Sequence, residues 1–199
     1  MFEEIGAGYP DIERERYIID IGAARLATRP EQFDVIVTPN LYGDILSDIA
    51  AELAGSVGLA GSANVGEHVA MFEAIHGSAP DLAGKGVANP SGLLLSAVMM
   101  LVHIRQPQVA ERIHNAWLRT LEDGIHTADV RGPHTRRTVG TEYFARAVVE
   151  RLGEKPRTLR PVAYRETAPA RPLQASVGYQ RRPAARKAMV GVDVFVHEA

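Results

Sequence analysis

The sequence contains no cysteine, which excludes disulfide frameworks and thiolate metal sites. Such a composition fits the reducing cytosol, where disulfides are rare. The sequence also lacks a long hydrophobic run. Its longest apolar stretch, residues 92–104, contains His103 and is shorter than the ~20 residues that a membrane helix needs. We therefore expect a cytoplasmic protein with no membrane partner, and residues 92–104 should form a buried helix.

The sequence also lacks a large excess of positive or negative charge, because the formal net charge is only -2. Nothing global therefore favours nucleic acid or an anionic membrane as a partner. The acidic start at residues 1–5 does not resemble a signal peptide. A hydrophobic content of 46% in 199 residues is enough for a real core, in one domain or in parts of two.

The common dinucleotide fingerprint is absent as well. Residues 55–66 are rich in glycine, but no Gly-x-Gly-x-x-Gly follows a strand and opens a helix. A classical Rossmann site is therefore not expected.

Residues 1–54 are expected to alternate between strand and helix. The pattern predicts a short strand at 17–19 that leads to Asp20, a helix at 21–28 stopped by Pro30, a β-branched strand at 33–38 and an amphipathic helix at 44–53. This order indicates a βαβα section of an α/β fold.

Three helices are predicted further along, at residues 90–104, 108–122 and 141–152, with Gly124 and Gly153 closing the last two. Residues 154–188 then hold five prolines and nine Arg or Lys, which predicts an extended linker. Residues 189–199 read as the first strand of a further domain. A lone strand would leave an open edge, so we expect residues 1–153 to be one domain and 189–199 the start of another.

Two carboxylates, Asp44 and Asp48, lie four residues apart in the predicted helix. Side chains at this spacing are neighbours roughly 6 Å apart on one helix face. Two like charges at that distance repel by about 3 kcal/mol at an effective dielectric near 20. A hard divalent cation would offset this cost, since Mg²⁺ prefers carboxylate oxygens. The alternative is a solvated first helical turn, where acidic residues favour the positive end of the helix dipole.

Two longer motifs resemble the β-decarboxylating dehydrogenases, which include the isocitrate, isopropylmalate and tartrate dehydrogenases. The first is Asp20 followed by Pro-Glu-Gln-Phe-Asp-Val-Ile-Val-Thr at 30–38 and Asn-Leu-Tyr-Gly-Asp-Ile-Leu-Ser-Asp at 40–48. The second is the run at 71–90, from Met-Phe-Glu-Ala-Ile-His-Gly to Val-Ala-Asn-Pro. The resemblance covers roughly residues 5–155. It implies an α/β fold of the three-layer isocitrate/isopropylmalate dehydrogenase type, not a classical Rossmann fold, with the first half lacking.

This resemblance implies that Mg²⁺ or Mn²⁺ is held by Asp44 and Asp48 of one subunit and Asp20 of the other, in a homodimer. The metal would bind the substrate's hydroxyl and carboxylate and act as a Lewis acid. Taken alone, Asp20 reads as a carboxylate at a strand end that caps the following helix, and its spacing to Pro30 and Asp44 is what favours the metal role.

The resemblance also implies that the loop from residue 76 to 89 wraps the adenosine half of the dinucleotide. The implied cofactor residues are His76, Gly77, Ser78, Ala79, Pro80, Asp81, Leu82 and Asn89. A lone loop histidine is more commonly structural, and Asn89 could simply end the loop before a helix.

Asp81 carries the prediction of cofactor type. NADP-dependent relatives resemble one another in having Lys-Tyr where this chain has Asp81-Leu82. A carboxylate can accept hydrogen bonds from the ribose hydroxyls and would repel a 2′-phosphate. We therefore expect NAD as the cofactor.

The tail resembles the extension of long, Thermus-type isocitrate dehydrogenases, which favours isocitrate as substrate and 2-oxoglutarate as product. The family's anion-binding cluster and its proton-transferring Tyr and Lys have no match before Asp20, so the resemblance implies no catalytic residue in this chain. We expect a C-terminal fragment that is inactive alone, because lost general acid–base groups cost about 10²–10⁴ each. The alternatives are 3-isopropylmalate or tartrate as substrate, a non-catalytic partner subunit, and a nucleotide-binding fragment.

Overall fold

The computed structural model describes residues 2–66 and 68–165. The strand predicted at 189–199 and most of the predicted linker lie outside the described residues. The helices are α1 (Phe2–Gly6), α2 (Ile19–Thr28), α3 (Asn40–Ala54), α4 (Ser91–His103), α5 (Pro107–Glu122) and α6 (Thr141–Glu150), with short 3₁₀ turns η1 (Pro30–Gln32), η2 (Val57–Leu59), η3 (Pro80–Leu82) and η4 (Ala128–Val130). The strands are β1 (Gly61–Val65), β2 (Ala70–Ala74), β3 (Ile125–His126) and β4 (Arg137–Thr138).

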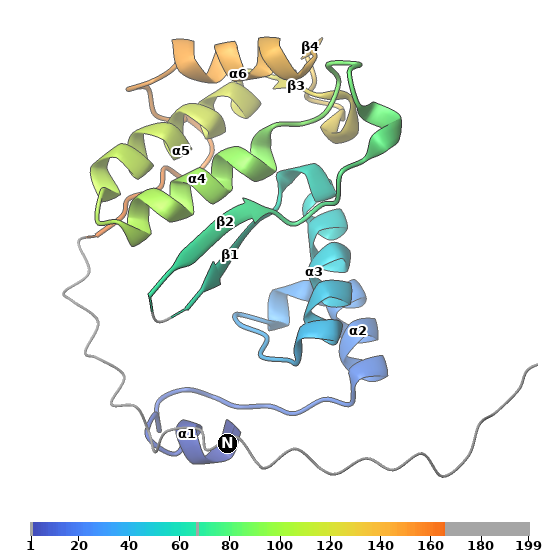
Figure 1. Cartoon of the computed structure of the whole chain (residues 1–199), viewed down its shortest axis with the longest axis vertical. Helices are drawn as coiled ribbons and strands as arrows, with labels where there is room; N and C mark the ends of the chain where they lie inside the picture. The colour runs from blue at the N-terminus through green and yellow to red at the C-terminus, as the bar shows by residue number, and fades with distance from the viewer. Residues whose placement is uncertain (1, 67, 166–199) are drawn as a thin grey trace, which may run out of the picture. The chain divides into compact units, whose positions relative to one another are not determined.

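Helices α4, α5 and α6 confirm the three helices expected from the sequence, within one or two residues at most ends. Helix α5 packs against both α4 and α6 (Figure 1). The buried cluster between them is Ala116, Trp117, Phe144 and Val148. Because α4 is apolar all round, it can bury one face against α5 and another against the hairpin.

Strands β1 and β2 form an antiparallel hairpin, with Gly61 paired to Ala74 and Val65 to Ala70. Helix α4 lies against this hairpin at close range because the contact positions are glycines. A Cβ on Gly61 would stand 2.8 Å from the Ser96 nitrogen, and one on Gly92 would stand 2.8 Å from the Ala60 oxygen. These distances leave no room for a side chain, so glycine sets the separation of helix and hairpin.

Two predicted strands do not form. Ile19 already belongs to α2, so residues 17–19 lead into a helix and Asp20 lies in its first turn. Residues 33–38 form neither helix nor strand in this structure, and Val35 and Val37 are 81% and 74% exposed. A β-strand needs a neighbour to receive its hydrogen bonds, and the described residues place none beside this segment. High β-propensity cannot supply a missing partner.

The segment after α6, residues 155–164, runs along α5 without regular secondary structure; we call it the strap. Asn115 of α5 donates to the Val162 oxygen at 2.8 Å and accepts from the Val162 nitrogen at 2.9 Å. Lys155 forms an ion pair with Glu111 at 3.0 Å. The strap is therefore attached to the helical core rather than free of it.

Across the described ranges, none of the helices combines the length and apolar character that crossing a membrane requires.

Candidate metal and cofactor site

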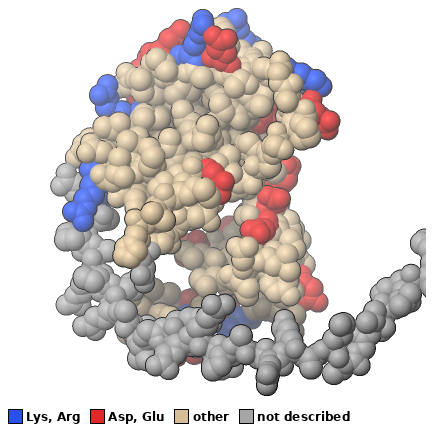
Figure 2. Space-filling model, viewed as in Figure 1, with Lys and Arg blue, Asp and Glu red and all other residues tan. Residues whose placement is uncertain are grey.

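Helix α3 presents Asp44 and Asp48 to solvent on one face. The helix begins at Asn40, four residues earlier than expected, so both carboxylates lie inside it. Leu46 lies about half a turn from each of them and is buried. The side of α3 opposite the two carboxylates therefore faces the protein interior. Figure 2 shows acidic side chains over the region of α3.

Neither carboxylate has an ion-pair partner among the described residues, and the nearest polar contact is Asn40 Nδ2, 3.4 Å from Asp44 Oδ2. Carboxylate oxygens that lie on one helix face without an ion-pair partner among the described residues are suitable ligands for a hard divalent cation.

Asp20 lies at the start of α2, where its carboxylate accepts a hydrogen bond from the Ile21 nitrogen at 2.6 Å. Within the described part of one chain, no group of three or more acidic or histidine side chains is placed to hold a metal ion. The structure therefore does not bring Asp20 together with Asp44 and Asp48 in one subunit. The prediction that Asp20 completes the site from a partner subunit stays a prediction.

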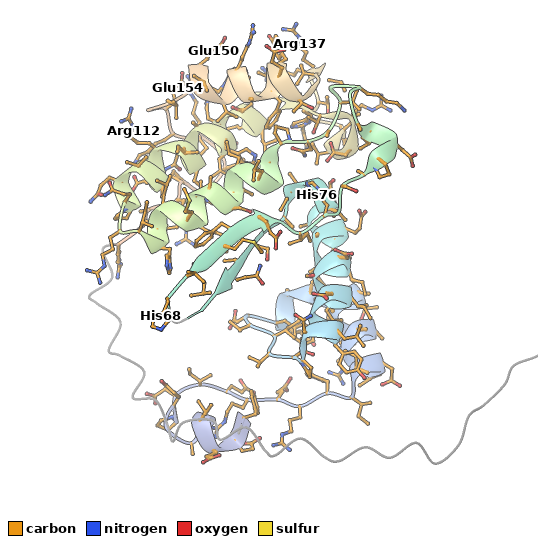
Figure 3. The ribbon with its side chains drawn as sticks, in the orientation of Figure 1. His68, His76, Arg112, Arg137, Glu150 and Glu154 are labelled. Atoms are coloured by element: carbon orange, nitrogen blue, oxygen red, sulfur yellow. The ribbon has the colours of Figure 1, made fainter. Side chains whose placement is uncertain are left out.

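The predicted cofactor loop begins where β2 ends. Figure 3 shows His68 at the tip of the hairpin and His76 beyond the other end of β2. Residues 76–88 are exposed, including every predicted cofactor residue except Asn89. His76 Nδ1 lies 2.9 Å from the Gly77 oxygen. The loop turns at Ala79, whose φ of 43° is in the left-handed region.

The far end of the loop is fastened to the start of α6. The Thr141 nitrogen donates to the Gly86 oxygen at 2.8 Å, and the Thr141 hydroxyl donates to the Ala88 oxygen at 2.5 Å. A Cβ on Gly140 would come within 2.4 Å of the Gly86 oxygen, so the contact requires glycine there. The loop is thus exposed along most of its length and anchored at its C-terminal end.

Asn89 is the buried residue of the loop, at 8% exposure. Its Nδ2 donates to Asp129 Oδ2 at 2.9 Å, and its Oδ1 accepts from the Ser91 nitrogen at 3.0 Å. Ser56 donates to the same Asp129 oxygen at 2.6 Å. Partial burial raises the pKa of Asp129, but the hydrogen bonds that its carboxylate accepts, that from Ser56 foremost, together outweigh burial and leave the pKa below its ordinary value.

Sequence reasoning missed Asp129 and Ser56. Both lie outside the two motifs, and no spacing pattern relates them to Asn89, because the contacts join segments distant along the chain.

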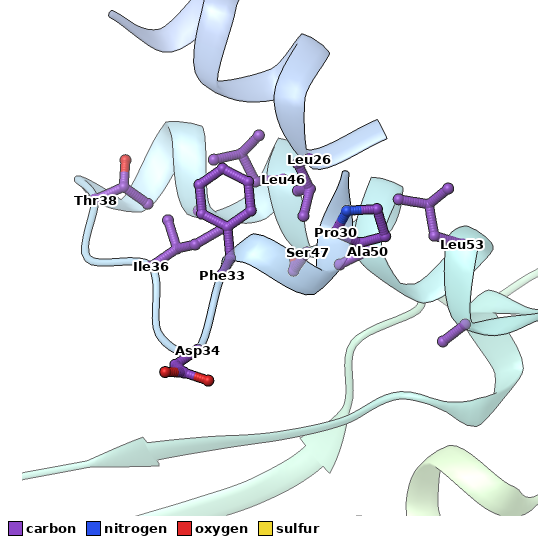
Figure 4. Close-up of a pocket in the computed structure, with 12 residues that line it drawn as sticks. Leu26, Pro30, Phe33, Asp34, Ile36, Thr38, Leu46, Ser47, Ala50 and Leu53 are labelled. Carbon is purple, nitrogen blue, oxygen red and sulfur yellow. The ribbon is translucent and has the colours of Figure 1, made fainter. Parts of the chain in front are cut away.

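An apolar cavity of about 510 Å³ lies between α2, α3 and residues 30–38. Figure 4 shows Leu26, Phe33 and Leu46 close together in its lining. This lining suits the packing of further apolar side chains. Its one charged lining residue is Asp34, an anion, and the lining contains no cationic side chain to bind a dinucleotide phosphate.

The sequence profile of the isocitrate/isopropylmalate dehydrogenases matches residues 1–148 of the chain. The chain belongs to this family. The resemblance stated from the two motifs is thereby confirmed, together with the α/β fold that it implies.

Named members of the isocitrate/isopropylmalate dehydrogenase family cover nearly the whole chain. The chain is 57% identical over 197 residues to an NADP-dependent isocitrate dehydrogenase of Rickettsia bellii, covering 98% of this chain and 40% of that protein. It is 47% identical over 196 residues to an NADP-dependent isocitrate dehydrogenase of Thermus thermophilus, covering 98% and 38%. The solved isocitrate dehydrogenase of Methylococcus capsulatus matches with a TM-score of 0.72 at 46% identity, over 75% of this chain and 44% of that one. The chain therefore spans about 40% of the length of the curated relatives it matches.

These relatives correct one expectation. The prediction of NAD from Asp81 is wrong, because the relatives from Rickettsia and Thermus are both named as NADP-dependent. The side chain of Asp81 is exposed in η3. In water the repulsion between two unit charges 4 Å apart is only about 1 kcal/mol. One solvated carboxylate is thus a weak determinant of the cofactor by itself.

Proposed function

We propose that the chain is the part of an NADP-dependent isocitrate dehydrogenase that carries the metal-binding aspartates and the adenosine-binding loop. The observation that carries the proposal is the close relationship to NADP-dependent isocitrate dehydrogenases across 98% of the chain. The geometry supports it independently: α3 offers Asp44 and Asp48 on one exposed face, and the anchored loop lies beyond the end of β2.

In this reaction a hydride passes from the carbinol carbon of isocitrate to the nicotinamide ring, and the hydroxyl proton is lost. The β-keto acid then loses CO₂, and protonation of the remaining carbon gives 2-oxoglutarate. When bound, Mg²⁺ or Mn²⁺ supplies Lewis-acid stabilisation of the substrate oxygens.

The chain's own residues bind and orient in this scheme. Asp44 and Asp48 hold the metal, with Asp20 completing the site from the second subunit of a cytoplasmic homodimer. The residues at 76–82 and Asn89 hold the adenosine half of NADP. Fixing one end of the dinucleotide lowers the entropy that must be lost to bring its reactive ring to the substrate. Proton transfer is not assigned to any residue of this chain.

Binding of cofactor and metal by the 199-residue chain tests the proposal. Calorimetric titration with Mn²⁺ and with NADP should show both ligands binding to the wild-type chain. Asp48→Asn should weaken Mn²⁺ binding by about 100-fold or more, since even the loss of a residue that only supports a ligand costs 10–100-fold. Asp34→Asn is the matched control, because it also removes an exposed carboxylate and should leave Mn²⁺ affinity unchanged. A folded wild-type chain that binds neither ligand contradicts the proposal.

A further inference from the structure

Two polar side chains, Ser56 and Asn89, from separate segments meet at Asp129, which lies in a third. Ser56 lies just beyond α3, Asn89 ends the cofactor loop, and Asp129 belongs to η4. A single oxygen, Asp129 Oδ2, accepts from Ser56 Oγ at 2.6 Å and from Asn89 Nδ2 at 2.9 Å. Both contacts are charge-assisted hydrogen bonds, which are stronger than neutral ones.

Gly58 makes room for this cluster. A Cβ at Gly58 would stand 2.9 Å from Asn89 Cβ, 3.0 Å from Asp129 Oδ2 and 3.3 Å from Ser56 Oγ. The Gly58 nitrogen also donates to Ser56 Oγ at 3.0 Å, which leaves the hydroxyl hydrogen free to point at Asp129. The backbone thus approaches the three side chains closely.

The cluster joins the two halves of the proposed site. The Ser56 nitrogen donates to the Ala51 oxygen at 3.1 Å, so Ser56 is fixed to the end of α3, the helix that carries Asp44 and Asp48. Asn89 is the buried residue of the otherwise exposed loop. Asp129 therefore connects, through its hydrogen bonds to Ser56 and Asn89, the segment that follows the metal-binding helix to the end of the adenosine loop.

We propose that Asp129 is a positioning residue for the cofactor: it fixes the orientation of Asn89 and the end of the adenosine loop relative to α3. An amide can present either its oxygen or its nitrogen, and only the present orientation both donates to Asp129 and accepts from the Ser91 nitrogen. Without Asp129 the amide and the loop end lose that anchor. This proposal rests on the proposed function of the loop, and Asp129 itself need not touch the dinucleotide.

A fluorescent side chain is connected to Asn89 through Ser91 and can report on the position of Asn89. Trp117, the one tryptophan in the sequence, donates from Nε1 to Ser91 Oγ at 2.8 Å. The Ser91 nitrogen in turn donates to Asn89 Oδ1 at 3.0 Å. A change in the position of Asn89 should therefore alter Trp117 emission.

The test titrates the full 199-residue chain with NADP and follows heat and Trp117 emission together. Asp129→Ala removes the acceptor and should weaken NADP binding by about tenfold, as expected for loss of one hydrogen bond to a charged group. Asp129→Asn keeps an oxygen that can accept both hydrogen bonds and should restore most of the affinity. Ser56→Ala removes one donor and gives a milder variant, with a smaller loss expected, should Asp129→Ala not fold.

Asp123→Ala is the matched control. Asp123 also follows α5 and also carries two charge-assisted contacts, to Arg119 and Arg151 at 2.9 Å each, but the loop takes no part in them. It should lower thermal stability and leave NADP affinity and the Trp117 response unchanged.

The outcomes separate the two proposals. Loss of affinity in Asp129→Ala, with recovery in Asp129→Asn and none of the loss in Asp123→Ala, supports the positioning role. Wild-type affinity in folded Asp129→Ala or Ser56→Ala overturns that role and leaves the proposed function standing. Equal losses in Asp129→Ala and Asp123→Ala also overturn it, because the effect would then follow stability. A wild-type chain that binds Mn²⁺ but not NADP overturns the positioning role, and one that binds neither overturns the proposed function with it.

Discussion

The carboxylate of Glu122 holds Thr158 by two groups at once, accepting from its backbone nitrogen at 2.5 Å and from its hydroxyl at 2.6 Å. The nitrogens of Arg157 and Leu159 donate to the same carboxylate at 2.7 and 2.9 Å. Arg119 donates to it from within α5 at 2.9 Å. One side chain at the end of α5 thus fastens three successive residues of the strap.

Replacing Glu122 by Gln should loosen the strap. The amide keeps one acceptor oxygen and loses the charge, so several of the strap's N–H groups lose their partner. We expect a fall in Tm of roughly 5–10 °C in a scanning calorimeter. Glu150→Gln, an exposed residue of α6, is the control and should change Tm by no more than about 1 °C. Equal Tm values for the two variants would show that the hydrogen bonds of Glu122 to the strap add nothing to stability.

The hydrogen bonds of Glu122 also predict an acid transition. Hydrogen bonds from the Thr158 hydroxyl and the Arg157 nitrogen lower the pKa of Glu122 well below its ordinary value of 4.5. Because the pKa is lower in the folded state, the stabilisation is complete above about pH 4.5 and is lost as the pH falls below it. The strap should therefore become sensitive to proteolysis in this acid range, and in Glu122→Gln the sensitivity should already be present at neutral pH.

His114 should make stability depend on pH nearer to neutrality. Its Nδ1 lies 2.7 Å from the Tyr164 hydroxyl at the end of the strap, and burial lowers its pKa below 6.5. The lowered pKa means that this contribution is full above about pH 6.5 and declines as the pH falls. Thermal unfolding at pH 7.5 and 5.5 should show lower stability at 5.5. His114→Gln should have a smaller difference between the two conditions, and an unchanged difference would exclude His114 as the cause.

Mixing two variants that each lack one proposed metal ligand tests whether the metal site is shared between subunits. Asp20→Asn and Asp44→Asn chains should each bind Mn²⁺ at least about 100-fold more weakly than wild type. A mixed dimer would contain one site with all three aspartates intact, so mixing should restore tight binding to a fraction of the sites. Sedimentation of the same mixture verifies dimer formation. If dimers form and no tight sites return, Asp20 does not act across a subunit interface.

Gly61→Ala tests the close contact between the hairpin and α4. The new methyl group would stand 2.8 Å from the Ser96 nitrogen, so the helix must shift, and overpacking of this kind costs about 1–3 kcal/mol. Urea unfolding should show this loss. Gly77→Ala is the control, because a Cβ there meets nothing within 4 Å. Similar stability of the two variants would show that the hairpin can move away at no cost.

Helices α4, α5 and α6 could be predicted from sequence because their signals are local. Apolar spacing, Pro107 near the start of α5 and the glycines at 124 and 153 act within a few residues. The relation of Asp44 to Asp48 is equally local, since residues four apart share a helix face wherever the helix lies. The two motifs identified the family for the same reason: they are contiguous in the sequence.

The failures concern interactions between distant residues. Residues 33–38 have the composition of a strand, yet a strand exists only beside another strand, and none lies there among the described residues. Asp81 suggested the wrong cofactor, because one exposed charge is weak in water and its effect depends on what surrounds it.

The sequence alone determined the family, the helices and the spacing of the α3 carboxylates, since each depends on residues close together in the chain. Only the tertiary structure decided that Asp129 holds Asn89, 40 residues away, and Ser56, 73 residues away. The same is true of the hold of Glu122 on the strap. Hydrogen bonds between distant residues form only after packing has brought their segments together, so no local pattern of side chains predicts them.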